Sequence, residues 1–174
     1  PGVIEDLLVR HGETGLASRK IELGEAEDEI EALFDRGWSD GLPLVPPTEA
    51  RVLRMLNGTT RDPKEVVGKM PSDLADCTIE KIAVNAVMAG CKPEYLPVVI
   101  AAVEAILEDP FALHGVLATT MYVGPVLVVN GPIRRHIGMN SKGNALGQGW
   151  RANSTIGRAV QLVVRNVGGG RPQE

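Results

Sequence analysis

The segment from Gly147 to Arg158 contains the residues best suited to bind an anion. Gly147 and Gly149 precede Arg151, Asn153 and Arg158 at a point where a helix should begin. Backbone N–H groups at a helix N-terminus and guanidinium groups both attract carboxylate or phosphate. Arg151 and Arg158 are two helical turns apart, so one helix face can carry both. We therefore expect these five residues to bind the acidic group of a small substrate.

The distribution of charge supports this interpretation and leaves one alternative open. No Asp or Glu lies between Pro110 and Gln173, whereas residues 1–50 hold twelve acids and four bases. The arginines of the acid-free segment therefore have no carboxylate nearby in sequence. They either bind an anionic ligand or pair with acids of the N-terminal half or of another subunit.

Three further residues are candidates for the site. Cys91 lies in an elbow between two expected helices, where Lys92 and the start of the second helix favour a thiolate and the end of the first disfavours it. Asp40 lies in a Pro- and Gly-rich loop that can hold a carboxylate in place. We assign Cys91 and Asp40 as candidate catalytic residues, and Asn130, at the end of an apolar run, as a further substrate-binding residue. The alternatives are a small buried cysteine and a turn-forming asparagine.

Residues 8–14 (LVRHGET) are similar to the signature of the histidine phosphatase family, in which an Arg-His-Gly supplies the phosphate-accepting histidine. That chemistry also requires a second histidine and a second arginine facing the first. Only His114 and His136 remain, and neither lies in the sequence context that this family uses. Phosphoryl transfer through His11 is therefore kept only as an alternative.

Periodicity predicts the elements that position these residues. We expect a single mixed α/β domain over residues 25–170, preceded by an arm or short strand over 1–24 and followed by a tail over 171–174. Two continuous apolar runs, residues 116–122 and 126–130, predict a small buried sheet that helices cover on both faces. A short extended piece is expected within residues 63–71. Apolar residues at helical spacing predict about five helices, at 25–36, 48–56, 78–90, 93–109 and from Asn153 or Ser154 to 168.

Composition excludes several classes of protein. The chain of 174 residues has a net charge of −4 and only 3% aromatic residues, which disfavours nucleic-acid binding. Its apolar runs are too short to cross a membrane, and Glu5 and Asp6 stand where a signal peptide would be basic. Cys77 and Cys91 form no disulfide framework, so a cytoplasmic location is expected. No spacing of His and Cys suggests a metal site, and the sequence identifies no cofactor.

Three longer strings point to a family. They are residues 38–48 (WSDGLPLVPPT), 78–95 (TIEKIAVNAVMAGCKPEY) and 151–158 (RANSTIGR). Together they resemble the N-terminal region of the bacterial UGSC-family (seleno)proteins, over roughly residues 25–170. That family is distantly similar to the selenoprotein B component of glycine and betaine reductases. The Sec/Cys-Gly-Ser-Cys element for which the family is named is absent from this sequence.

The resemblance and the anion motif together predict a subunit or domain of a bacterial enzyme, of oxidoreductase or lyase type, that acts on a small anionic molecule. Because the redox element is absent, thiol or redox chemistry would be completed by a partner subunit or a further C-terminal region. The expected partners are the small anionic substrate and either further copies of the chain or a partner subunit, with neither nucleic acid nor a membrane. A non-catalytic assembly domain is the alternative from a different class.

Overall fold

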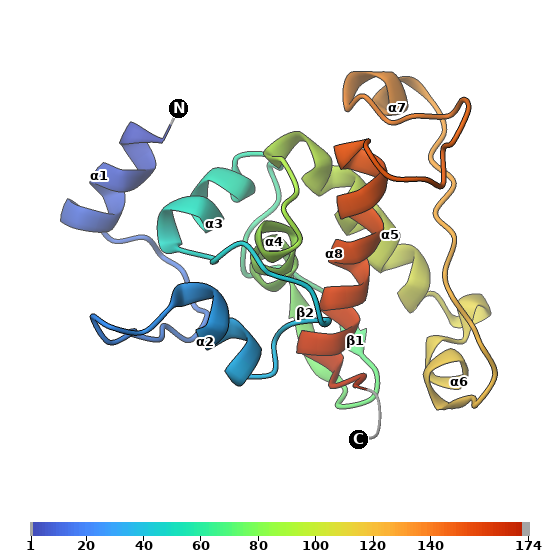
Figure 1. The fold of residues 1–174 in the computed structure, drawn as a ribbon, viewed down its shortest axis with the longest axis horizontal. Coiled ribbons are helices and arrows are strands. Elements are labelled where there is room, and N and C mark those ends of the chain that lie inside the picture. Colours follow the sequence, from blue (N-terminus) through green and yellow to red (C-terminus); the bar gives the residue numbers. More distant parts are fainter. Residues whose placement is uncertain (1, 172–174) are drawn as a thin grey trace.

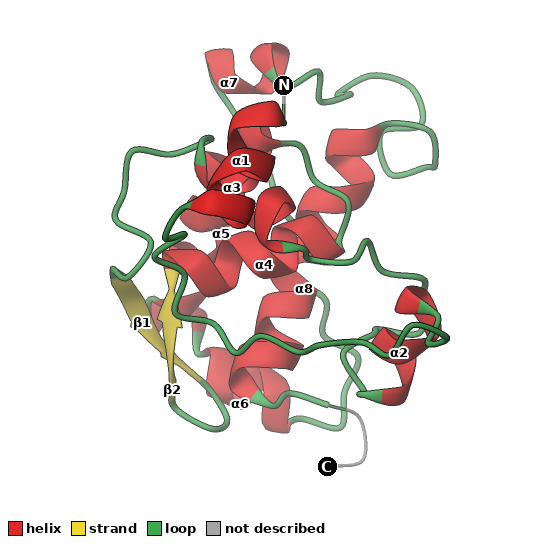
Figure 2. Ribbon diagram, turned by 90° about the vertical axis from the view of Figure 1, so that its left-hand side faces the viewer, coloured by secondary structure: helices red, strands yellow, loops and turns green. Residues whose placement is uncertain are grey.

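The computed structural model describes residues 2–171, and most of its regular structure is helical (Figure 1). The eight α-helices of this part of the chain are α1 (Val3–His11), α2 (Glu29–Asp35), α3 (Glu49–Leu56), α4 (Ile79–Met88), α5 (Leu96–Leu107), α6 (Leu113–Ala118), α7 (Pro132–His136) and α8 (Arg151–Gly168). Two short 3-10 helices, η1 (Pro93–Tyr95) and η2 (Asp109–Phe111), flank α5. The strands β1 (Val66–Met70) and β2 (Ala75–Thr78) form a hairpin at one edge of the helical body (Figure 2).

Helices α4 and α8 pack against each other and form the centre of the core. Helix α4 begins where the Thr78 hydroxyl oxygen accepts a hydrogen bond from the backbone N–H of Lys81, as the capping pattern predicts. Ile79, Ile82 and Ala83 of this helix are fully buried. Helix α5 packs against both α4 and α8. The predicted helices at 48–56, 78–90 and 93–109 are thus present, with bounds that differ by a few residues.

The hairpin closes one side of this core. Its strands are antiparallel, with Gly68 opposite Cys77, and the side chains of Met70 and Cys77 are completely buried. The carbonyl of Gly168, at the end of α8, accepts hydrogen bonds from the backbone N–H groups of the residues that follow Pro71. A Cβ at residue 168 would overlap the carbonyl oxygen of Pro71, so only glycine permits this close approach.

The predicted sheet over residues 116–122 and 126–130 is wrong. Helix α6 covers residues 113–118, and residues 119–131 form neither helix nor strand in the described chain. Strand propensity takes effect only where a neighbouring strand supplies hydrogen bonds and packing, and the fold places none beside this segment. The only sheet among residues 2–171 is the β1–β2 hairpin, whose first strand lies within the extended piece predicted at 63–71. The fold class is therefore mixed, but residues 2–171 form eight α-helices rather than about five.

Two further boundaries differ from the prediction. The N-terminal arm begins with helix α1, whose side chains are not buried. The last helix begins at Arg151 with Trp150 in the N-cap position, and therefore neither Asn153 nor Ser154 caps it. Of the predicted tail, residues 172–174 lie outside the described residues. None of the helices within residues 2–171 combines the length and the hydropathy needed to cross a membrane.

Candidate functional site

A cavity of about 620 Å³ lies beneath the segment that leads from α1 towards α2. We call residues 13–23 the strap, because this stretch is bound to Glu49 of α3 and Glu80 of α4 and lines the cavity with Leu16 and with residues 18–23. The rest of the lining comes from α2, α3, α4, the loop that follows Gly37, and the end of α8. Its apolar members include Leu33, Trp38 and Met88. The volume and the largely apolar lining are those of small-molecule sites.

The strap is held in place by two carboxylates. Glu80, at the start of α4, is 2% exposed and accepts hydrogen bonds from the backbone N–H groups of Ala17 at 2.9 Å and Ser18 at 2.7 Å. Glu49 binds the Lys20 ammonium at 2.5 Å, and that contact lowers the pKa of the Glu49 carboxyl. These contacts fix a segment that has no regular secondary structure of its own.

Two asparagines form a hydrogen-bonded pair at one end of the cavity. The Asn166 amide nitrogen donates to Asn85 Oδ1 at 2.9 Å and to the carbonyl of Trp38 at 3.1 Å. Asn85 in turn donates to the carbonyl of Lys81 at 2.9 Å. Because both neighbours of the Asn166 amide nitrogen are acceptors, the orientation of that amide is fixed. Its Oδ1 is fully buried, so it does not reach the open space of the cavity, and it accepts no hydrogen bond from residues 2–171.

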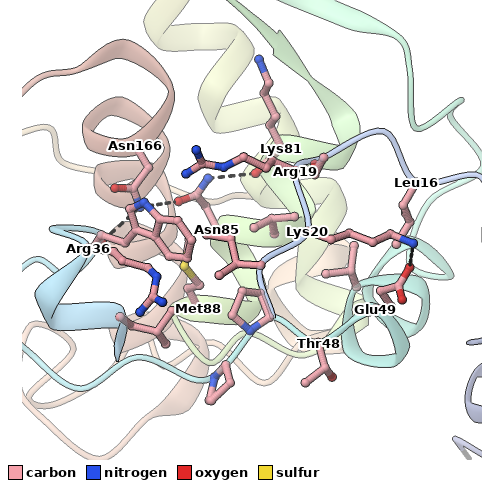
Figure 3. A pocket seen from close by; sticks show the side chains of 18 of the residues that line it. Leu16, Arg19, Lys20, Arg36, Thr48, Glu49, Lys81, Asn85, Met88 and Asn166 are labelled. Carbon is pink, nitrogen blue, oxygen red and sulfur yellow. Dashed lines mark hydrogen bonds and ion pairs between the residues drawn. The ribbon is translucent and has the colours of Figure 1, made fainter. Parts of the chain in front are cut away.

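The cavity carries four cations, of which Arg19 is the one available to a ligand. Lys20 is paired with Glu49, Arg36 binds the carboxylate of Glu27 at 2.7 Å, and Lys81 donates to the backbone carbonyl of Asp76 at 2.6 Å. No carboxylate within the described chain lies within 4 Å of the Arg19 guanidinium. Figure 3 shows the Arg19 side chain reaching over Asn85 towards Asn166.

The carboxylates of the lining do not compete for Arg19. Glu80 is turned to the strap backbone and Glu49 to Lys20. Glu22 and Glu29 are exposed, so water screens the charge of their carboxylates. The cavity therefore offers one guanidinium without a carboxylate partner among residues 2–171, within a mostly apolar lining.

Four of the eight residues predicted from the sequence, namely Asp40, Cys91, Arg151 and Arg158, lie outside this cavity in a second region. Arg158 donates from Nε and Nη2 to the two carboxylate oxygens of Asp40, each at 2.8 Å. It also donates to the carbonyls of Leu42 and Pro43. Hydrogen bonding from Arg158 lowers the pKa of Asp40 below its ordinary value. Arg158 thus pairs with an acid of the N-terminal half, which is the alternative that the sequence left open.

Cys91 lies in the elbow between α4 and η1, and Arg151 lies at the start of α8. The Cys91 thiol lies 3.4 Å from the carbonyl of Thr155, and Arg151 Nε donates to the carbonyl of Gly90 at 2.9 Å. Burial raises the pKa of the Cys91 thiol to about 11. The structure therefore brings Asp40, Cys91, Arg151 and Arg158 to one region, in which the thiol remains protonated at neutral pH.

The other predicted ligand-binding residues have separate surroundings. The side chain of Asn153 bonds to the backbone of Asn140 and to the carbonyl of Ala145, and so fastens the loop before α8. Gly147 donates to a carbonyl within that loop, and Gly149 has a φ of 110° immediately before the helix. Asn130 is exposed on the segment between α6 and α7. Among residues 2–171, no hydrogen bond joins Asn130 to the rest of the predicted set.

The burial of both cysteines predicts low thiol reactivity. The pKa of Cys77 is also raised to about 11 by burial. At pH 8, the thiolate fraction of each cysteine should be about 100-fold smaller than that of an ordinary thiol. We expect the folded protein to react with an aromatic disulfide reagent far more slowly than the same chain in guanidinium chloride, where two thiols react. Rapid modification of Cys91 in the folded protein would contradict this assignment and restore it as a candidate nucleophile.

None of the eight predicted site residues lines the cavity, and Arg19, Asn85 and Asn166 were not among the predicted residues. A signal for two of them was present. Asn85 interrupts the apolar face of the helix at residues 79–88, and Asn166 interrupts that of the last helix. A buried amide on each of two packed helices indicates a polar contact inside the core. Arg19 carried no such signal, because its neighbours in space are distant in sequence.

Within residues 2–171, no three side chains of His, Cys, Asp or Glu are grouped so that they could hold a metal ion. Comparisons with protein-family models, with curated proteins and with solved structures find no match to this chain.

Proposed function

We propose that this chain is the ligand-binding subunit or domain of an enzyme that acts on a small organic anion, which binds in the cavity beneath the strap. The observation that carries the proposal is the Arg19 guanidinium, which lines a mostly apolar cavity and has no carboxylate partner among residues 2–171. A guanidinium recognises carboxylate or phosphate.

The guanidinium and the apolar lining define the chemistry of the ligand. Arg19 would bind its acidic group. Trp38, Leu33 and Met88 offer apolar surface for the remainder of the molecule. A small carboxylic acid with an apolar side chain satisfies both requirements, and the volume of the cavity suits a molecule of that size.

The chemical step is proposed to be of oxidoreductase or lyase type, in keeping with the resemblance to the UGSC family. A thiol-dependent step would use a group supplied by a partner, because the pKa of both cysteines of this chain is raised to about 11. In this proposal, the chain binds and orients the substrate and leaves bond breaking to that partner.

The proposal predicts ligand-dependent stabilisation that depends on Arg19. Phosphate, short carboxylates, hydroxy acids and amino acids are titrated while the melting temperature is followed, since a ligand that binds only the folded state raises it. For the acid that gives the largest shift, calorimetry should show at least about tenfold weaker binding to the Arg19→Ala variant, because a charge-assisted hydrogen bond contributes about 1.5–3 kcal/mol. Arg19 is exposed, so its removal should leave the melting temperature of the free protein unchanged.

Arg151→Ala is the matched control. Arg151 is exposed, as Arg19 is, but it lies outside the cavity, at the start of α8. Unchanged affinity in this variant supports the cavity. If Arg151→Ala abolishes binding and Arg19→Ala does not, the anion binds at the start of α8 and the cavity proposal is wrong. If no acid in the panel changes the melting temperature, the non-catalytic assembly domain becomes the better interpretation.

A further inference from the structure

The segment between α6 and α7 (residues 119–131) has the composition of a β-strand, but no strand lies beside it. It runs along the outer flank of the molecule, on the side away from α1 and α2 (Figure 1). Within the described chain, the backbone of residues 120–130 makes no backbone–backbone hydrogen bond. Apart from the N–H of Met121, which donates to the Thr119 hydroxyl oxygen, and Pro125, which has no N–H, these backbone groups are therefore available to another extended chain.

From Val126 to Asn130 the side chains alternate between exposed and partly buried, as they do in a strand with one covered face. Val126 and Val128 are 77% and 78% exposed, whereas Leu127 is partly buried and packs against the core. Met121 and Tyr122 are also exposed. Large apolar side chains gathered in one short segment mark an interaction site, in contrast to single apolar residues scattered over a surface.

Nothing in this segment opposes pairing with an identical one. No charged residue lies between His114 and Arg134. Exposed strands of folded proteins are usually protected by charges, bulges or prolines, and here Pro125 is the only such device. Two copies can approach without repulsion of like charges. The apolar side chains of one copy then pack against the same side chains of the other.

We propose that residues 119–131 form a dimerisation strand, which pairs antiparallel with the same segment of a second copy of this chain. Antiparallel pairing of identical strands has twofold symmetry, so the pair closes on itself. A pairing centred on Val128 places the two Val128 residues opposite each other. The strap lies on the other side of the molecule (Figure 1), and no residue of 119–131 lines its cavity, so this proposal is independent of the proposed function.

Sedimentation velocity of the full chain, from low micromolar to hundred-micromolar concentration, provides the test. We expect a reversible monomer–dimer equilibrium. Val128→Lys should raise the dissociation constant at least about tenfold, because it places two ammonium groups opposite each other across the pair. Leu146→Lys is the matched control, since Leu146 is 99% exposed in the loop before α8, and this variant should dimerise as the original chain does.

A charge-swap experiment identifies the occupant. Val128→Glu alone should also fail to dimerise, but an equimolar mixture of the Val128→Glu and Val128→Lys chains should recover the dimer, because opposite charges then face each other. Recovery supports pairing of two copies through this segment. The proposal is overturned if the original chain remains monomeric over the whole range, if Val128→Lys dimerises normally, or if association yields growing aggregates instead of a closed dimer.

Discussion

Replacing Arg158 by alanine is expected to lower the free energy of unfolding by about 2–3 kcal/mol, because the mostly buried carboxylate of Asp40 then loses two charge-assisted hydrogen bonds. The side chains of Arg158 and Asp40 are only 19% and 9% exposed, so water replaces these bonds poorly. Arg158 also fixes the carbonyls of Leu42 and Pro43, and its loss should loosen the loop that leads to the cavity. Urea unfolding followed by circular dichroism measures this change.

A double-mutant cycle separates the ion pair from other effects of the substitution. Asp40→Asn, Arg158→Ala and the double variant are compared with the original chain, and a coupling energy of at least about 1 kcal/mol is expected for groups in direct contact. Arg151→Ala serves as control, because that exposed arginine of the same helix makes one hydrogen bond to a backbone carbonyl and no ion pair with residues 2–171. A coupling energy near zero would show that Asp40 and Arg158 do not stabilise the fold as a pair.

The same pair predicts a dependence of stability on pH. Arg158 holds the pKa of Asp40 below its ordinary value of 3.8 in the folded state. The stabilisation is therefore complete above the pKa of the unfolded chain, and it is lost as the pH falls through the lower pKa of the folded protein. The difference in unfolding free energy between the original chain and Asp40→Asn should be constant from about pH 5 to 7 and should shrink below about pH 4.

Replacing Glu80 by alanine is expected to release the strap. The buried carboxylate accepts hydrogen bonds from two consecutive backbone N–H groups, those of Ala17 and Ser18, and no other contact in the described chain replaces them. Charge-assisted hydrogen bonds of this kind contribute about 1.5–3 kcal/mol, so local opening of the strap should increase at least about tenfold. Amide hydrogen exchange at Ala17 and Ser18 measures this opening directly.

Glu29→Ala is the matched control, because Glu29 also lines the cavity but is exposed and makes no ion pair among residues 2–171. Its substitution should leave exchange at Ala17 and Ser18 unchanged. Under the proposed function, Glu80→Ala should also weaken ligand binding, since the strap carries Arg19. Unchanged exchange in Glu80→Ala would show that the other contacts, chiefly Lys20 with Glu49, suffice to hold the strap.

Local signals in the sequence determined much of the helical part of the fold. Thr78 begins α4, Pro93 begins the turn before α5, and the apolar stripes of α4, α5 and α8 face the core as predicted. These features depend on residues within one or two turns of each other, so the local sequence contains their whole cause. The anion-binding residues proposed from the same kind of local evidence remain a prediction.

Tertiary structure alone decided which extended segments pair and which charged groups meet. Residues 66–70 and 75–78 form the hairpin, while the more apolar run from Val126 to Asn130 is left unpaired, because pairing depends on which segment the fold brings alongside. Arg158 meets Asp40 across 118 residues of sequence, and Glu80 meets Ser18 across 62. No spacing rule reaches over such separations. The cavity likewise depends on tertiary contacts, because α4 and α8 place Asn85 beside Asn166 and the carboxylates of Glu80 and Glu49 hold the strap.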